Sequence, residues 1–409
     1  GSRILAFGTR FARAPGPALT ASSLPRWPAS RPRSLSLGRP RAELAARMEE
    51  RTRMILDVDT GTDDALALLL ALRCPSVEVL AVTCVHGNVE VGKVLQNTLR
   101  TLDAAEAPPD VPVSAGFEEP LVEPVTHCPQ IHGQDGLADL QPPLPPSRRR
   151  PCEEHAVELL NSTLRRAPGP VVVVGLAPLT NIAVAFRMSP ALWRAKVERI
   201  VWMGGAVSGG GNATPWAEAN ARYDPEAAHI MLSSGLPFLI YPWDVFLKVS
   251  YTKDELRSLG VADVDGGEGK GVAGVGGANG KAEDGPARPR WSVLAGRLLW
   301  REFRHFDVKE AMIGDAGAVA AALRPGALKT RRLSVAVELH GGRTRGMTVC
   351  DLRPFAHPPD EPQKSPNAEV VVDVDARALK AFFTEYVLAP QAEESWCNGS
   401  PAAKRRREG

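Results

Sequence analysis

Short runs of apolar residues, many of them rich in valine, recur along the chain. The runs with strand character are 54–58, 77–85, 171–176, 199–207, 237–245, 333–339 and 368–374. Segments with helical spacing of apolar residues lie between them, at 64–73, 91–105, 153–167 and 224–232. Continuously apolar strands that alternate with helices predict an α/β fold, a doubly wound and mainly parallel sheet with helices on both faces. Such sheets bind ligands beyond the carboxyl ends of their strands.

Three segments lack this periodicity, and they flank or interrupt the predicted fold. Residues 1–51 are rich in Arg, Ser and Pro, which predicts a disordered leader or, alternatively, a mitochondrial transit segment over residues 1–47. The Gly-rich stretch 262–290 predicts a disordered insert, and the stretch 391–409 predicts a disordered basic tail. We therefore expect a single α/β domain over residues 52–390, interrupted by the insert.

Composition argues against several other classes of protein. Apolar residues make up 44% and charged residues 23% of the 409 positions, which is typical of a globular chain with a sizeable core. The six cysteines lack CxxC spacing, so neither a zinc site nor a disulfide framework is indicated. No apolar run is long enough to predict a membrane span, and basic residues concentrate at the predicted disordered ends rather than in a nucleic-acid-binding groove. We expect a cytoplasmic protein, or a mitochondrial one if the leader is a transit segment.

Four carboxylates crowd the carboxyl end of the first predicted strand. Asp57 and Asp59 lie at the strand end, and Asp63 and Asp64 lie in the first turn of the following helix. The positive end of a helix can stabilise two of these charges. The others would still repel, by about 4 kcal/mol for a pair about 4 Å apart near a protein surface. A hard divalent cation with oxygen ligands, such as calcium or magnesium, would relieve this repulsion.

Two known acidic motifs are natural comparisons for this stretch. An EF-hand loop that began at Asp57 would need Gly at its sixth position and Glu at its twelfth, where this chain has Thr62 and Leu68. The strand-end DxDx[TV] of haloacid-dehalogenase-type phosphatases differs from "DVDTGT" by one residue. From this stretch alone, an aspartate-nucleophile phosphatase remains an alternative.

The remainder of the chain resembles the inosine-uridine-preferring nucleoside hydrolase family. The opening "DVDTGTDDALALLLAL" is similar to the DxDxGxDDAxAL motif of that family. Further similar motifs follow in order: "VHGNV", "IHGQDGLAD", "LAPLTNIAVA", "MGGAVSGGGNATPWAEANARYDPEAA", "GDAGAVAAAL" and "TRGMTVCDLR". The resemblance covers roughly residues 54–388 without the Gly-rich insert, and it implies a nucleoside hydrolase-like α/β fold.

The resemblance also implies a calcium site and a catalytic base. The implied calcium ligands are three carboxylates and one backbone carbonyl: Asp59, Asp64, Asp315 and Leu176. Asp57 would orient these ligands through hydrogen bonds. Asp63 would be the general base that takes a proton from the attacking water.

The same resemblance implies a ribose site. The side chains expected to hold the ribose hydroxyls are Asn88, Asn212, Glu218 and Asn220, and Met203 would lie under the sugar. His132 is either a catalytic residue on an active-site loop or an ordinary surface residue. Asn181 is expected to cap a helix, and Trp216 and Trp243 are expected either to pack in the core or to stack on a base.

These residue types suit the cleavage of an N-ribosidic bond. The transition state resembles an oxocarbenium ion, which neighbouring carboxylates and amide oxygens stabilise. A site that holds both ribose hydroxyls should reject 2′-deoxyribose, because a missing hydroxyl leaves buried polar groups unpaired. The resemblance therefore implies a calcium-dependent ribonucleoside hydrolase whose partner is a small nucleoside or riboside, and we expect a homo-oligomer, dimer or tetramer.

One position departs from the family pattern. The family usually places His directly before the late metal-binding aspartate, as a proton donor for the leaving base, and this chain has Gly314 there. Loss of a general acid should cost about 10²- to 10⁴-fold in rate unless another group replaces it. Because uracil leaves more easily than a purine, Gly314 favours pyrimidine nucleosides. It also raises a second hypothesis, a catalytically weak or inactive protein that binds ribonucleosides or ribosides.

Overall fold

The computed structural model describes residues 51–208, 210–265, 288–353 and 364–389. Nearly all of the predicted leader, most of the predicted insert and the whole predicted tail lie outside the described residues. Within these ranges, no helix is long and apolar enough to cross a membrane.

A central sheet of eight strands organises the described part of the chain. Its strands are β1 (Thr52–Val58), β2 (Val77–Cys84), β3 (Val113–Ala115), β4 (Val171–Gly175), β5 (Val197–Met203), β6 (Phe238–Tyr241), β9 (Leu328–Leu333) and β12 (Ala368–Val374). All neighbours pair in parallel except β12 and β9, which pair antiparallel at one edge. The predicted mainly parallel sheet is therefore confirmed.

The order of the strands reverses beside β1. Across the sheet the strands run β3-β2-β1-β4-β5-β6-β12-β9, so the chain first builds outward from β1 in one direction and then continues from β4 in the other. Connections on the two sides of such a reversal diverge and leave a crevice at the carboxyl ends of the two central strands. The acidic stretch that follows β1 lies at this position, next to the end of β4.

Two hydrophobic layers pack on opposite faces of this sheet. In β1, Met54, Leu56 and Val58 face one layer while Ile55 faces the other, and all four are fully buried. Alternate residues of a strand point to opposite faces, so a strand covered on both sides must be apolar throughout. This is why the strands appear in the sequence as continuous valine-rich runs.

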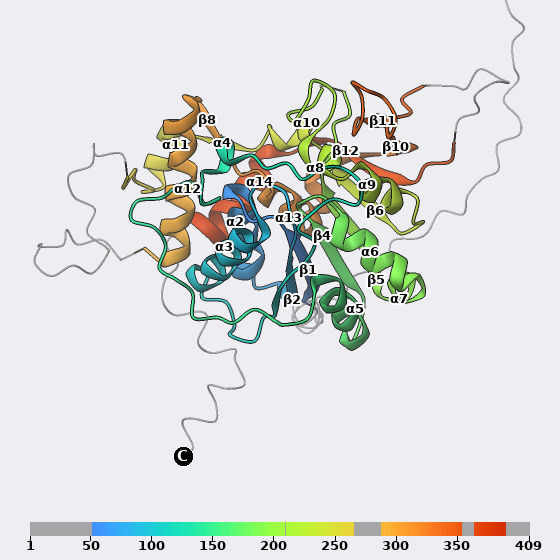
Figure 1. The fold of residues 1–409 in the computed structure, drawn as a ribbon. Coiled ribbons are helices and arrows are strands. Elements are labelled where there is room, and N and C mark those ends of the chain that lie inside the picture. Colours follow the sequence, from blue (N-terminus) through green and yellow to red (C-terminus); the bar gives the residue numbers. More distant parts are fainter. Residues whose placement is uncertain (1–50, 209, 266–287, 354–363, 390–409) are drawn as a thin grey trace, which may run out of the picture. The chain divides into compact units, whose positions relative to one another are not determined.

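Helices cover both faces, as Figure 1 shows. The first layer contains α2 (Thr62–Arg73), α3 (Val91–Ala104), α12 (Arg290–Phe306), α13 (Ala316–Leu323) and α14 (Ala376–Phe383). The second contains α5 (Ala156–Arg166), α6 (Thr180–Met188), α7 (Pro190–Lys196) and α9 (Pro225–Leu232). The shorter helical elements are α4 (Pro129–His132), α8 (Ala219–Tyr223), α10 (Trp243–Phe246), α11 (Lys253–Ser258), η1 (Pro325–Ala327) and η2 (Thr384–Leu388). The predicted arrangement with helices on both faces is confirmed.

The structure corrects one predicted strand. The apolar run 333–339 does not form a single strand of the main sheet, because it divides between the end of β9 and a separate short strand, β10 (Val335–Val337). β10 pairs with β11 (Thr348–Cys350), and another small sheet joins β7 (Ser250–Thr252) to β8 (Glu310–Met312). Most of β9 is polar and half-buried or exposed, since it is an edge strand, and the apolar pattern therefore gave no signal for it.

Candidate active site

The turn that leaves β1 is held by its own carboxylates. Gly61 precedes the first residue of α2, and its backbone N–H donates to Asp64 Oδ2 at 2.9 Å. The backbone N–H of Asp59 donates to the other oxygen of Asp64, at 3.2 Å. Asp64 thus closes the turn by satisfying N–H groups at the start of the helix, as acidic residues do at this position. Its carboxylate is fully buried.

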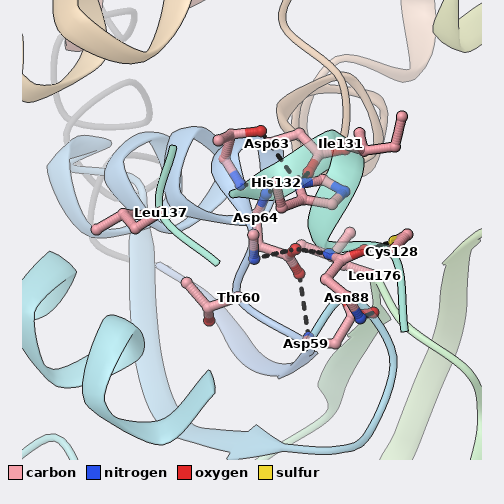
Figure 2. A network of polar contacts seen from close by, with 12 residues as sticks. Asp59, Thr60, Asp63, Asp64, Asn88, Cys128, Ile131, His132, Leu137 and Leu176 are labelled. Carbon is pink, nitrogen blue, oxygen red and sulfur yellow. Dashed lines mark hydrogen bonds and ion pairs between the residues drawn. The ribbon is translucent and has the colours of Figure 1, made fainter. Parts of the chain in front are cut away.

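Asn88, in the loop after β2, connects two of the carboxylates. Its backbone N–H donates to Asp59 Oδ2 at 2.9 Å, and its side-chain Nδ2 donates to Asp64 Oδ2 at 3.1 Å. Figure 2 shows these three residues close together, with Cys128 next to the Asn88 amide. The Cys128 thiol donates to Asn88 Oδ1 at 3.3 Å. The orientation of the Asn88 amide is therefore fixed from both of its ends.

Asp315 reaches the same place from a distant part of the sequence. It precedes α13, which packs against α2 below the turn. One carboxylate oxygen from each of Asp63, Asp64 and Asp315 can be chosen so that all three lie within 4.8 Å of one another. Among the described residues, this is the one group of His, Cys, Asp or Glu side chains with the spacing of a metal site. The predicted ligand Asp59 is not part of this group, although it lines the same cavity.

Burial and mutual repulsion raise the pKa values of these carboxyl groups. Burial raises the pKa of Asp64 to about 7, and the charge of Asp63 adds to this effect. Burial, followed by the charge of Asp64, raises the pKa of Asp59 well above its ordinary value. The pKa of Asp315 is raised by burial and then by the charges of Asp63, Asp64 and Asp59. A bound cation would reverse these shifts, since it stabilises the ionised carboxylates.

Asp57 lies behind the cluster rather than in the cavity. Its Oδ1 accepts hydrogen bonds from Thr83 Oγ1 at 2.6 Å and from Asn181 Nδ2 at 2.9 Å. Its Oδ2 is buried without a hydrogen-bond partner among the described residues, and burial raises the pKa of Asp57 to about 7. The expectation that Asn181 caps a helix was wrong, because its side chain contacts Asp57, the Cys84 carbonyl and the Phe117 N–H instead.

A cavity of about 650 Å³ opens over the carboxylates. Most of the predicted site residues line it, namely Asp59, Asp63, Asn88, His132, Leu176, Met203, Asn212, Glu218, Asn220 and Asp315. Asp57 and Asp64 are fully buried next to it. Residues that lie far apart in the sequence, from Asp59 to Asp315, therefore come together at the predicted crevice.

Three of the residues predicted to hold ribose, Asn212, Glu218 and Asn220, lie in the loop that follows β5 and in α8. Glu218 caps α8, because its carboxylate accepts from the backbone N–H groups of Asn220 at 2.9 Å and Ala221 at 3.1 Å. It also accepts from the Gly205 N–H at 2.7 Å, and burial raises its pKa to about 7. Asn220 Nδ2 donates to the carbonyls of Leu176 and Met203, both at 3.0 Å. These bonds tie the ends of β4 and β5 to one side of the cavity.

Asn212 and the two tryptophans occupy different parts of this region. Asn212 is exposed on the loop after β5, and its Oδ1 accepts from the Ala219 N–H at 2.8 Å. Trp243 lines the cavity and packs against Phe246 with ring centroids 4.7 Å apart. Trp216 is 50% exposed and does not line the cavity. Of the two tryptophans, Trp243 is thus the one in a position to meet a ligand.

His132 faces the acidic turn. It lies at the end of α4, and its Nδ1 is 3.2 Å from the backbone nitrogen of Thr62, which donates to it, and 3.8 Å from Asp63 Oδ1. Burial lowers the pKa of His132. The alternative of an ordinary surface loop residue does not fit this geometry, because the side chain is buried and lines the cavity.

Gly314 lies against the predicted general base. Its φ of +56° is in the left-handed region, which residues with a Cβ rarely adopt. A Cβ at this position would lie 2.5 Å from the Cβ of Asp63 and 3.1 Å from Cζ of Phe246. A side chain at position 314 would therefore displace Asp63 unless the backbone changed. In this fold, the glycine allows the chain before Asp315 to approach α2 closely.

Sequence reasoning missed several charged residues of the cavity, among them Glu302. Glu302 lies on α12 and lines the cavity together with its neighbours Leu298, Arg301 and Phe306. No motif marks it, because α12 follows the Gly-rich stretch and has the pattern of an ordinary amphipathic helix. The available signal was the single acidic residue of an otherwise basic amphipathic helix.

Comparisons with known proteins agree with this architecture. Residues 54–381 match the family model described as inosine-uridine preferring nucleoside hydrolase. The pyrimidine-specific ribonucleoside hydrolase RihB of Escherichia coli (strain SE11) is 33% identical over 302 residues, which are 74% of this chain and 88% of that protein.

Solved structures show the same relationship. The inosine-guanosine nucleoside hydrolase IG-NH superposes with a TM-score of 0.71 at 29% identity, covering 82% of this chain and 98% of that one. The plant nucleoside hydrolase PpNRh1 gives a TM-score of 0.70 at 28% identity, covering 83% and 99%. The chain therefore belongs to the inosine-uridine preferring nucleoside hydrolase family and is a ribonucleoside N-glycosidase.

Proposed function

We propose that this protein hydrolyses the N-glycosidic bond of ribonucleosides to ribose and free base, depends on calcium, and prefers pyrimidine nucleosides. The observation that carries the proposal is the meeting of Asp63, Asp64 and Asp315 within 4.8 Å, beside a cavity of about 650 Å³ at the reversal of strand order. A nucleoside needs both parts, an acidic centre for the sugar and a hollow for the base.

The donor set suits calcium. Asp59, Asp64, Asp315 and the carbonyl of Leu176 supply only oxygen atoms, which hard cations prefer. Their carboxyl groups are buried with raised pKa values, so they are costly to ionise without a counter-charge. The chemistry that a cation would supply at these residues is Lewis-acid activation, which makes a water molecule more acidic.

Asp63 is the proposed general base. It is the least buried of the three clustered carboxylates, and it lines the cavity beside His132. The His132 Nδ1 is 3.8 Å from Asp63 Oδ1, so the imidazole lies directly beside the carboxylate. Asp63 would take a proton from water as the water oxygen attacks C1′ of the ribose.

The sugar would be held by the polar groups around the carboxylates. Asn88 and Asn220 have their amides fixed by neighbouring hydrogen bonds, so little side-chain entropy remains to be lost on binding. Glu218 also lines the cavity, and in its ionised form it would stabilise the developing sugar cation. Met203, which is 3% exposed, offers an apolar surface to the sugar.

The preference for pyrimidines has two supports. Gly314 provides no imidazole at the position where the family usually has one, and uracil depends less on a strong acid than a purine does. The RihB relative is named as pyrimidine-specific. A weaker acid in the cavity would suffice for such a substrate.

A panel of nucleosides assayed with and without a chelator tests the proposal. Ribose release from uridine, cytidine, inosine and 4-nitrophenyl riboside is measured first in excess calcium and then in EDTA. We expect release from uridine and cytidine that EDTA abolishes and calcium restores, with no release from 2′-deoxyuridine. Release that EDTA leaves unchanged would contradict the calcium requirement.

The same panel addresses the alternative of a catalytically weak or inactive binding protein. Ribose or uridine binding by calorimetry, without turnover of any panel member, would favour that alternative. We also propose that the protein forms a homo-oligomer, which size-exclusion chromatography with light scattering would test.

A further inference from the structure

Proton donation to the leaving base is a function that no predicted residue performs well. We propose that Glu302 is the general acid of this enzyme and donates a proton to the base as the N-glycosidic bond breaks. The inference rests on the proposed hydrolysis and adds a residue on α12, far in sequence from the acidic turn. It accounts for an enzyme of this family that has Gly314 where the usual imidazole would be.

The position of Glu302 fits this function. It lies on the face of α12 that lines the cavity, one turn after Leu298 and beside Arg301. Its carboxyl group is half-buried, so it is reached from the cavity. Oε2 accepts from the backbone N–H of Met312 at 2.9 Å, which fixes the side chain. Oε1 has no hydrogen-bond partner among the described residues and can therefore carry the proton toward a ligand.

The surroundings keep Glu302 protonated. Burial and, to a smaller extent, the Asp63 charge raise its pKa to about 8, although the Met312 N–H and the Arg301 charge oppose the shift. At neutral pH the Glu302 carboxyl group is therefore protonated in most molecules. A general acid works best when its pKa lies near the working pH. Arg301 also donates to the carbonyls of Ile131 and Ala138, which ties α12 to the loop that carries His132.

Three other ionisable groups of the cavity, His132, Tyr223 and Glu218, are less suited. His132 Nδ1 accepts from the Thr62 N–H, and burial lowers the pKa of His132, so the ring is a neutral imidazole at neutral pH. Loss of the remaining proton from a neutral imidazole is very unfavourable. Burial raises the pKa of the Tyr223 phenol beyond its ordinary value, so it holds its proton tightly. Both oxygens of Glu218 are occupied by backbone N–H donors.

The proposed step is balanced. As the bond between C1′ and the base nitrogen breaks, its electron pair moves to the base. The Glu302 proton passes to a ring nitrogen or carbonyl oxygen of that base. Water supplies the oxygen that bonds to C1′, and its proton goes to Asp63. Asp63 then returns a proton to solvent and Glu302 takes one up, so one nucleoside and one water give one base and one ribose.

The substitution Glu302→Gln tests the acidic proton of the side chain separately from its hydrogen bond to the backbone. Glutamine has nearly the same shape and still accepts from the Met312 N–H, but it cannot donate an acidic proton. The variant is compared with wild type on uridine, inosine and 4-nitrophenyl riboside, whose nitrophenolate leaves without protonation. We expect kcat/KM to fall about 10²-fold or more on both nucleosides and less than about threefold on the nitrophenyl riboside.

Glu158→Gln is a matched control, since Glu158 is exposed on α5, in the helix layer on the other face of the sheet. It should leave all three rates unchanged. Equal losses by the Glu302 variant on all three substrates would assign a structural role and overturn the inference, and so would unchanged rates on both nucleosides. If wild type hydrolyses none of the substrates, the proposed function fails, and the inference that rests on it fails as well.

Discussion

The acidic wall of the cavity and the wall formed by α12 are built from different kinds of residues. The acidic wall consists of Asp59, Asp63, Asn88 and Asp315, at strand ends and helix starts of the central sheet. The α12 wall consists of Leu298, Arg301, Glu302 and Phe306, on one face of a single helix. Asp59 and Asp315 are 2% and 3% exposed, whereas Phe306 is 38% exposed.

This difference indicates how a family can keep one chemistry and change its substrates. Backbone positions at the carboxyl ends of parallel strands are fixed by the whole sheet, so side chains there keep their geometry. Residues on one face of a covering helix can change without moving the sheet. The acidic wall is thus suited to the reaction common to the family, and the α12 wall to the choice and protonation of the base.

Removal of the metal should have the largest effect on activity. EDTA is expected to reduce ribose release to background with every substrate, because the acidic wall loses the counter-charge that keeps its carboxylates together. Addition of calcium in excess should restore the activity. Activity in EDTA equal to that in calcium would show that the acidic wall works without a cation.

Calcium should change how the stability of the protein depends on pH. The pKa values of Asp57 and Asp64 are raised to about 7 in the folded protein without metal. These groups bind more protons when folded than when unfolded, so the metal-free protein should lose stability as pH rises from about 5 to about 8. Calcium binds the ionised carboxylates, so the Tm increase it causes should grow over that range. A constant increase would contradict the assigned ligands.

The substitution Asp63→Ala should lower kcat by about 10²- to 10⁴-fold on nucleosides, because the attacking water loses its base. It should spare the fold, since Asp63 is half-buried and makes few hydrogen bonds. The kcat on the nitrophenyl riboside should fall by the same factor, because every substrate needs the attacking water. The Glu302 variant is expected to differ in this respect. Intact turnover by Asp63→Ala would refute the assignment of the base.

The substitution Gly314→His should not restore a family-like acid. The left-handed backbone and the 2.5 Å approach to the Asp63 Cβ predict a loss of about 1–3 kcal/mol in stability. Activity should fall about tenfold or more as Asp63 is displaced. Denaturant unfolding and kcat/KM on inosine measure the two effects. A gain of activity on inosine would show that a histidine at position 314 can act as the general acid. That result would contradict the assignment of this role to Glu302 alone.

The smallest effect is expected for Trp216→Ala. Trp216 is half exposed and lies outside the cavity, so kcat/KM should stay within about threefold of wild type. Trp243→Ala is the companion variant, and it should raise KM by about tenfold because Trp243 lines the cavity. An equally large effect of Trp216→Ala would contradict its placement outside the ligand site, and would mean that the loop carrying Trp216 contacts the ligand.

Local sequence was sufficient to predict much of the fold. Valine-rich strands buried on both faces and amphipathic helices between them indicated the parallel sheet. The predicted ends of β1, β2, β4 and β12 were correct to within two residues. The predicted strand over 333–339 was wrong as a single element. An edge strand such as β9 pairs with one neighbouring strand only and is less buried, so its sequence carries a weak apolar pattern.

The sequence by itself determined the acidic turn, because four carboxylates within eight residues after a buried strand need a helix start and a counter-charge wherever the rest of the chain lies. Only the tertiary structure decided which distant residues share that turn. Packing of α13 on α2 brings Asp315 to it, Asn181 supports Asp57 from α6, and α12 places Glu302 over the cavity. Spacing along a chain reports neighbours within one element, whereas burial of one element against another sets the distances between them and the pKa values that follow.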